Sequence, residues 1–168
     1  MKKVIIVNGS GGVGKTTFET MIAGHLPAYK YSSIDIVKDM TEVCGINRND
    51  KDEDTRKLWS DIKKLLIAYD DIPYKDVAKV IDDFNNDDMP HELLLIDIRE
   101  PEEIERAKYE FNAITVLVVN NNVKHIISNA SDRRVFDFEY DFVIDNSGDL
   151  NNLEEEVKRF IEWLKGEM

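Results

Sequence analysis

The stretch VIIVNGSGGVGKTT (4–17) most constrains the fold of this chain, because an apolar run leads directly into a glycine-rich segment and then into a helical pattern. It matches G-x-x-x-x-G-K-[ST], with Gly9, Gly14, Lys15 and Thr16 in register. Glycines at these places let backbone N–H groups turn inward around a phosphate, and the following helix points its positive end at the same anion. The segment therefore predicts a loop that binds a nucleoside triphosphate.

The motif also predicts individual roles. Lys15 is expected to reach the β- and γ-phosphates, and the Thr16 hydroxyl to ligate Mg²⁺. We expect ATP and Mg²⁺ as cofactors. The residues expected to contact the nucleotide are Gly9, Ser10, Gly11, Gly12, Val13, Gly14, Lys15, Thr16 and Thr17.

A second carboxylate follows another apolar run, LLLI (93–96), which ends at Asp97. Ligands bind at the carboxyl ends of strands in open α/β sheets, and a strand-end acid organises Mg²⁺ in many phosphate-loop proteins. Strand alternation places Arg99 on the same side as Asp97. Asp97 is predicted to help hold Mg²⁺ and Arg99 to contact phosphate. A helix cap for Asp97 and a surface ion pair for Arg99 remain alternatives.

Strand and helix patterns alternate along the chain. Continuous apolar runs predict strands at 2–8, 92–98, 113–120 and 140–146, with a weaker candidate at 29–33. Helical patterns cover 15–26, 52–70, 100–111 and about 150–165. We therefore expect one α/β domain of three layers around a mostly parallel sheet.

Two of these helical patterns carry apolar faces, and one acidic segment carries none. The helix at 52–70 is expected to bury Leu58, Ile62, Leu65 and Tyr69. The last helix is expected to bury Leu150, Leu153, Val157, Phe160, Ile161 and Leu164. The acidic segment DDFNNDD (82–88) is predicted to be a solvated loop.

The net charge excludes some classes of partner. Acidic residues number 34 and basic residues 22, which gives a formal charge of −12. This field repels nucleic-acid backbones, so no nucleic-acid partner is expected. No apolar run is long enough to cross a membrane, and the lone Cys44 agrees with a reducing compartment. A cytoplasmic location is predicted, and the oligomeric state is left open.

Three further stretches resemble known kinases. DIREPEE (97–103) is similar to the D-[VT]-R-x-x-N-E stretch of phage-type deoxynucleoside monophosphate kinases, and YDFVIDNSGDLNNLEEEV (140–157) is similar to the ending of that group. YSSID (31–35) resembles the S-T-x-D step of adenylate-kinase-like enzymes. The chain therefore resembles the nucleoside monophosphate kinase superfamily. The resemblance implies a single domain over 1–168 and a five-stranded parallel sheet, with the loop strand beside the Asp97 strand.

Acceptor residues follow from this resemblance. It implies substrate-binding helices at about 34–85 and a short lid at about 120–140, where Arg133 or Arg134 would cover the γ-phosphate. Arg56 and Lys63 lie seven residues apart on the helix at 52–70 and so share a face. This face either binds the acceptor or is simply exposed to solvent. The residues expected to contact the acceptor are Ser33, Asp35, Arg56, Lys63 and Arg99.

The predicted function is an ATP- and Mg²⁺-dependent phosphotransferase with a small phosphorylated acceptor, a nucleoside or deoxynucleoside monophosphate. One alternative is a regulatory ATPase switch, since GGVGKTT (11–17) also resembles the loop of partitioning ATPases, although Ser10 stands where those carry a lysine. The other alternative is a nucleotide-binding kinase relative without activity, because lids of this superfamily often carry more arginines.

Overall fold

The chain divides into two compact units. The computed structural model describes residues 2–50, 52–86, 90–123 and 134–166. Unit 1 comprises Met1–Lys30 and Met89–Met168, and unit 2 comprises Tyr31–Asp88. In the described part of the chain, no helix is both long and apolar enough to cross a membrane.

The sheet has five strands in the order β2-β3-β1-β4-β5. They are β1 (Lys3–Asn8), β2 (Ala28–Ser32), β3 (Leu93–Asp97), β4 (Ile114–Val119) and β5 (Phe142–Asp145). The strand β1 pairs in parallel with β3 and with β4, and β4 pairs in parallel with β5. All five predicted strands are confirmed, and so is the placement of the loop strand β1 beside the Asp97 strand β3.

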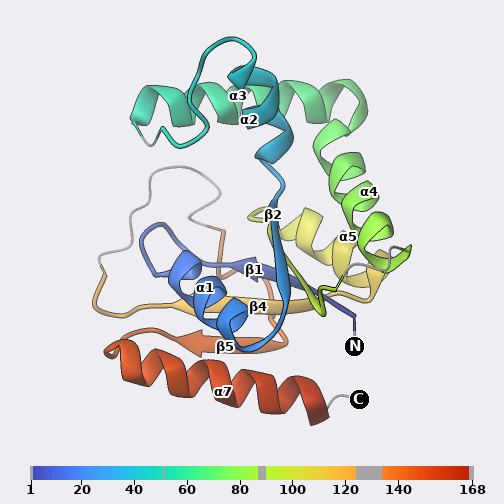
Figure 1. Cartoon of the computed structure of the whole chain (residues 1–168). Coiled ribbons are helices and arrows are strands. Elements are labelled where there is room, and N and C mark those ends of the chain that lie inside the picture. The colour runs from blue at the N-terminus through green and yellow to red at the C-terminus, as the bar shows by residue number, and fades with distance from the viewer. Residues whose placement is uncertain (1, 51, 87–89, 124–133, 167–168) are drawn as a thin grey trace. The chain divides into compact units, whose positions relative to one another are not determined.

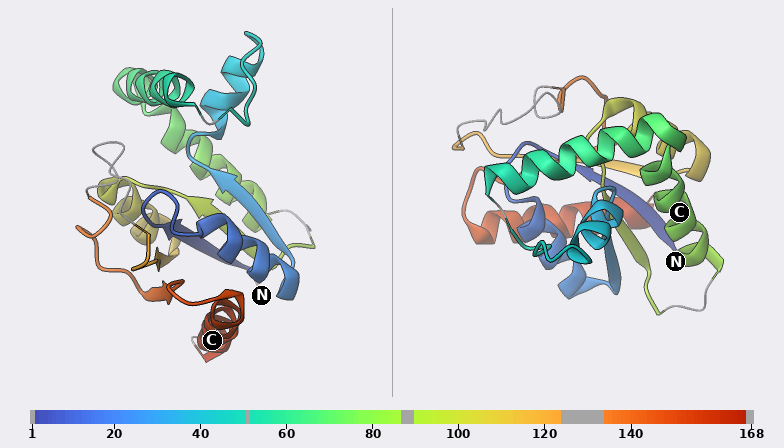
Figure 2. Two further views of the ribbon diagram at one scale, coloured as in Figure 1. Left: turned by 90° about the vertical axis from the view of Figure 1, so that its left-hand side faces the viewer. Right: turned by 90° about the horizontal axis from the view of Figure 1, so that it is seen from above.

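Helices cover both faces of the sheet in unit 1. They are α1 (Lys15–His25), α5 (Pro101–Phe111) and α7 (Leu150–Gly166). The helices α1 and α7 lie on one face and contact each other, whereas α5 contacts β1 and β4 from the other face (Figures 1 and 2). Because both faces are covered, β1, β3 and β4 are continuous apolar runs rather than alternating ones.

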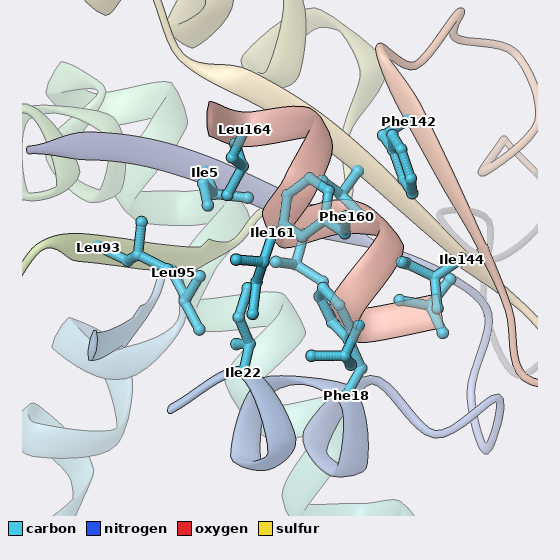
Figure 3. Close-up of a cluster of buried hydrophobic side chains, with 14 of the residues drawn as sticks. Ile5, Phe18, Ile22, Leu93, Leu95, Phe142, Ile144, Phe160, Ile161 and Leu164 are labelled. Atoms are coloured by element: carbon cyan, nitrogen blue, oxygen red, sulfur yellow. The ribbon is translucent and has the colours of Figure 1, made fainter. Parts of the chain in front are cut away.

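A cluster of buried side chains joins α1 and α7 to the sheet (Figure 3). Phe18 and Ile22 come from α1, and Ile5 and Leu95 from β1 and β3. The α7 side chains Leu153, Val157, Phe160, Ile161 and Leu164 are buried as predicted, while Leu150 at the start of the helix is exposed.

The strand β5 lies at one end of the strand order, and α7 covers it. The ring centroid of Phe142 lies 4.9 Å from that of Phe160 and 5.2 Å from that of Trp163. The guanidinium of Arg159 lies 4.4 Å from the centroid of Phe142, and its Nη2 donates to the carbonyl oxygen of Val143 (3.0 Å). Arg159 thus occupies both a ring and a backbone acceptor of this strand.

Unit 2 contains three helices, α2 (Asp35–Glu42), α3 (Glu53–Asp70) and α4 (Ile72–Asn86). The long helix α3 lies beside α2 and is followed directly by α4 (Figure 2). The Asp52 side chain caps α3 by accepting a hydrogen bond from the Thr55 N–H (2.9 Å). The prediction of a loop at 82–88 was wrong, because residues 82–86 continue α4 and Phe84 is buried.

The prediction of the apolar face of α3 was wrong at Leu58, Leu65 and Tyr69, whereas the fourth residue, Ile62, is half-buried. Trp59 is 6% exposed, whereas Leu65 is 70% and Tyr69 83% exposed, and Leu58 is exposed as well. The indole N–H of Trp59 donates to the hydroxyl of Thr41 on α2 (2.8 Å). The largest apolar side chain and its polar partner therefore set the packed face of the helix.

Candidate active site

The loop between β1 and α1 requires glycine at two places. Gly14 has φ 94°, and a Cβ there would lie 2.2 Å from Nδ2 of Asn146. A Cβ at Gly9 would lie 2.5 Å from the carbonyl oxygen of Val118. The motif glycines are thus required by close approach of neighbouring strand ends as well as by the curve of the loop.

Two asparagines hold this loop, and neither was singled out from the sequence. Asn8 is fully buried, accepts a hydrogen bond from the Gly9 N–H (2.8 Å) and donates to the Tyr140 hydroxyl (2.7 Å). Asn146 donates through Nδ2 to the carbonyl oxygen of Val13 (2.8 Å). The available signal was their position, because each directly follows or ends an apolar strand.

The positive groups of the loop lie at the start of α1. Lys15 Nζ donates to the carbonyl oxygens of Gly9 (2.5 Å) and Ser10 (3.3 Å), so the ammonium turns back over the loop. The N-cap residue Gly14 has no side chain to cap the helix, and Thr16 is exposed in the first turn. Uncapped N–H groups at a helix N-terminus bind anions readily.

Asp97 ends the neighbouring strand β3 with an oxygen that fits a cation. Its Oδ1 is buried and accepts no hydrogen bond from the described residues. Burial raises the pKa of Asp97, and the charges of Lys15 and Arg99 oppose this rise. Those two cations therefore lie close enough to affect the charge state of the Asp97 carboxyl. A carboxylate oxygen without a donor, beside a phosphate-binding loop, suits the hard oxygen-seeking Mg²⁺.

Sequence analysis missed a second carboxyl at the same place. Glu19 on α1 is 5% exposed, and Lys30 Nζ lies 3.0 Å from its Oε2. Burial and the charge of Asp97 raise the pKa of Glu19 to about 7, against the opposing effect of Lys30. The available signal was the spacing, because Glu19 lies one helical turn after Lys15 and so shares its face.

In unit 2 the structure brings together two of the predicted acceptor residues. Lys63 Nζ on α3 donates to the Ser33 hydroxyl (3.1 Å). Asp35 is the first residue of α2, and its carboxylate accepts hydrogen bonds from the Ser32 N–H (2.9 Å) and from Lys38 Nζ (3.1 Å). The Asp35 carboxylate therefore contacts a backbone N–H and a lysine within its own unit.

The other basic residues of α3 are at its surface. Arg56 is exposed, and Lys64 Nζ lies 3.5 Å from an oxygen of Asp61. Lys63 and Lys64 are thus adjacent lysines with different surroundings, one against the Ser33 hydroxyl and one in an exposed ion pair.

Of the two arginines expected in the lid, the structure describes one. Arg133 lies outside the described residues. Arg134 pairs with the carboxylate of Glu102 on α5 through Nη1 (3.1 Å) and Nη2 (2.5 Å), and its Nε lies 3.6 Å from Asp137. In this structure the contacts of Arg134 are therefore carboxylates of its own unit.

The comparisons with known proteins concern the fold. The sequence matches no family model and none of the curated proteins. Among solved structures, a shikimate kinase from Bacteroides thetaiotaomicron superposes with a TM-score of 0.53 at 12% identity, over 97% of this chain and 98% of that one. A shikimate kinase from Aquifex aeolicus gives a TM-score of 0.51 at 15% identity, over 98% and 97%.

These similarities show the P-loop kinase fold and confirm the predicted fold class. The resemblance to adenylate-kinase-like and phage-type enzymes is confirmed only at the level of this fold. The loop, the first turn of α1 and Asp97 together form an arrangement suited to holding a nucleotide's phosphates with a divalent cation.

Proposed function

We propose that this protein is a small-molecule kinase that moves the γ-phosphoryl group of ATP, with Mg²⁺, to a nucleoside or deoxynucleoside monophosphate. The observation that carries the proposal lies in unit 1, where the Lys15 ammonium turns back over the glycine loop and Asp97 ends the adjacent strand with a buried oxygen that accepts no hydrogen bond from the described residues. The P-loop kinase fold supports it.

In this proposal the loop N–H groups and Lys15 hold the β- and γ-phosphates. Thr16 and Oδ1 of Asp97, which accepts no hydrogen bond from the part of the chain that the structure describes, would hold Mg²⁺. When bound, the cation neutralises charge on the phosphate oxygens. The bond between the γ-phosphorus and its bridging oxygen breaks, ADP leaves with that oxygen, and an oxygen of the acceptor forms the new bond. Arg99 and one arginine of the lid stabilise the charge of the moving group.

The surroundings of Asp35 favour an acceptor that is already phosphorylated. A hydroxyl acceptor needs a base to take its proton, whereas a phosphate oxygen does not. Asp35 accepts from Ser32 and Lys38 and lies 3.8 Å from Arg48, so it is paired with donors rather than poised as a base. Ser33, Asp35, Arg56 and Lys63 are then proposed to bind the acceptor.

The test is ADP release from Mg²⁺·ATP, with and without nucleoside and deoxynucleoside monophosphates. Shikimate and dephospho-coenzyme A provide the hydroxyl arm of the panel. We expect one monophosphate to accelerate ADP release by orders of magnitude. An alcohol as the best acceptor would refute the choice of acceptor class, and no response to any compound would favour a switch ATPase or an inactive relative.

Adjacent lysines on α3 provide a matched pair of variants. Lys63→Ala and Arg56→Ala are expected to raise KM for the acceptor, and Arg99→Ala to raise KM or lower kcat. Lys64→Ala changes the same charge at an exposed ion pair and is expected to leave both constants unchanged. Equal effects of Lys63→Ala and Lys64→Ala would remove Lys63 from the acceptor site.

A further inference from the structure

Tyr140 carries a half-buried hydroxyl that the transfer described above does not use. The hydroxyl accepts a hydrogen bond from Nδ2 of Asn8 (2.7 Å) and donates one to the carbonyl oxygen of Val135 (2.8 Å). Burial raises the pKa of Tyr140 to about 12, against the opposing effect of the hydrogen bond with Asn8, so the hydroxyl keeps its proton near neutral pH. It can therefore act as a donor and as an acceptor at the same time.

The Asn8 side chain joins this hydroxyl to the phosphate-binding loop. Asn8 is fully buried at the end of β1, and its Oδ1 accepts a hydrogen bond from the Gly9 N–H (2.8 Å). Its Nδ2 also lies 3.4 Å from the carbonyl oxygen of Arg99. A backbone N–H can only donate and a backbone carbonyl can only accept, so these partners fix which way the Asn8 amide points.

The hydrogen bonds therefore run in one direction, from the loop to the segment 134–141. The Gly9 N–H donates to Asn8, and the Asn8 amide donates to Tyr140. Tyr140 in turn donates to Val135, which is fully buried. All four residues belong to unit 1. Without the Tyr140 hydroxyl, Nδ2 of Asn8 keeps only the longer contact to the Arg99 carbonyl among the described residues, and the amide is held less firmly.

The other end of this chain, Gly9, is the residue at which the loop leaves β1. Asn8 binds the N–H of Gly9, and Lys15 Nζ donates to its carbonyl oxygen (2.5 Å). The backbone also passes close to the next strand here, because a Cβ at Gly9 would lie 2.5 Å from the carbonyl oxygen of Val118. A group that fixes Gly9 therefore also affects where the Lys15 ammonium and the following loop N–H groups lie.

We propose that Tyr140 is a positioning residue for the phosphate-binding loop, which holds the start of the loop through Asn8 and so links nucleotide affinity to the segment 134–141. The inference rests on the proposed nucleotide site. Tyr140 is not assigned a contact with the nucleotide, because both hydrogen bonds of its hydroxyl are made within the protein.

The first test is Tyr140→Phe, which removes the hydroxyl and keeps the ring that packs edge-on against Phe138, with ring centroids 5.1 Å apart. ADP binding is measured by calorimetry. We expect the variant to bind ADP about 3- to 10-fold more weakly, the factor by which loss of a hydrogen bond between uncharged groups typically changes an equilibrium. Tyr109→Phe removes a hydroxyl from an exposed side chain of α5 and should bind ADP as the wild type does.

A double-mutant cycle tests whether Tyr140 acts through Asn8. The same measurement is made on Asn8→Ala and on the double variant Asn8→Ala/Tyr140→Phe. If Asn8 is the link, Tyr140→Phe weakens ADP binding in the wild-type background and has no further effect once Asn8 is alanine. Equal effects in the two backgrounds would overturn the inference.

Hydrogen exchange gives a readout that needs only the wild type and Tyr140→Phe. Coupling between two sites is reciprocal, so saturating ADP should slow amide exchange in the peptide that spans residues 134–141 of the wild type. The slowing should be smaller in Tyr140→Phe. No slowing in the wild type would overturn the link between the loop and this segment.

These outcomes separate the inference from the proposed function. If the wild-type protein does not bind ADP, the proposed nucleotide site fails and the role of Tyr140 fails with it. If the wild type binds ADP and Tyr140→Phe binds it equally well, only the role of Tyr140 is overturned. A variant that is less stable in urea but has wild-type affinity for ADP would have the same meaning, because the hydroxyl would then serve packing alone.

Discussion

The burial of Glu19 leads to a quantitative prediction about stability and pH. Burial and the charge of Asp97 raise its pKa from 4.5 to about 7. Between those values the native protein keeps a proton that the unfolded chain has released, so the free energy of unfolding falls as the pH rises. The contribution is fully present below pH 4.5 and is lost as the pH rises through about 7.

The magnitude follows from the size of the shift. At about 1.4 kcal/mol per unit, a rise from 4.5 to about 7 corresponds to roughly 3 kcal/mol, of which about 2 kcal/mol falls between about pH 5 and about pH 8. Glutamine at position 19 cannot ionise. As the pH rises over this range, the free energy of unfolding of the wild type should therefore fall by about 2 kcal/mol relative to that of Glu19→Gln.

The assay is urea denaturation followed by far-ultraviolet circular dichroism at both ends of the range, with linear extrapolation to water. Glu162→Gln, at an exposed position of α7, is the control and should follow the wild type at both pH values. If the Glu19→Gln and wild-type curves stay parallel across the range, Glu19 is not protonated in the native protein and the reasoning from burial is refuted.

Three further predictions concern the loop and the core. Gly14→Ala places a Cβ 2.2 Å from Nδ2 of Asn146 at φ 94°, so ADP binding measured by calorimetry should be lost. Asn8→Ala leaves the Gly9 N–H and the Tyr140 hydroxyl without this partner and should lower the free energy of unfolding by about 1–3 kcal/mol in urea denaturation. Phe160→Ala empties the centre of the aromatic cluster and should cost about 3–5 kcal/mol in the same assay; a loss below about 1 kcal/mol would contradict the described packing.

The centre of the sheet could be predicted from the sequence because β1, β3 and β4 are apolar on both faces. A short continuous apolar run that is bounded by polar residues, such as LLLI (93–96), is typical of a strand buried on both faces. The phosphate loop was predictable for a related reason, since Gly9 and Gly14 meet local steric requirements that belong to the loop and its immediate neighbours.

Two helices of unit 2, α3 and α4, were harder to predict, each for a different reason. In α3 the apolar residues extend around more than one face, so periodicity alone does not choose between Leu58 and Trp59, and the indole hydrogen bond to Thr41 decides. In α4 the acids at 82 and 83 are exposed while Phe84 is buried, which gives a polar-looking segment with a single inward side chain.

The site was predictable residue by residue but not in its connections. Asp97 follows from its strand, but its charge raises the pKa of Glu19, which lies in a different element far away along the chain. Asn146 reaches Val13 across 133 residues, a contact that depends on which strands lie side by side. Such pairs need the strand order, which the resemblance to known kinases gave only in part.

The contacts of Arg159 have a consequence for how this protein behaves at high concentration. The terminal strand of a sheet offers unpaired backbone groups that can template pairing with another chain, and long basic side chains are one way in which natural proteins block this. By donating to the Val143 carbonyl oxygen and covering the Phe142 ring, Arg159 occupies one of these groups and puts a charge beside it. The same side chain that packs α7 against β5 thus also leaves one backbone acceptor fewer on this terminal strand for another chain to pair with.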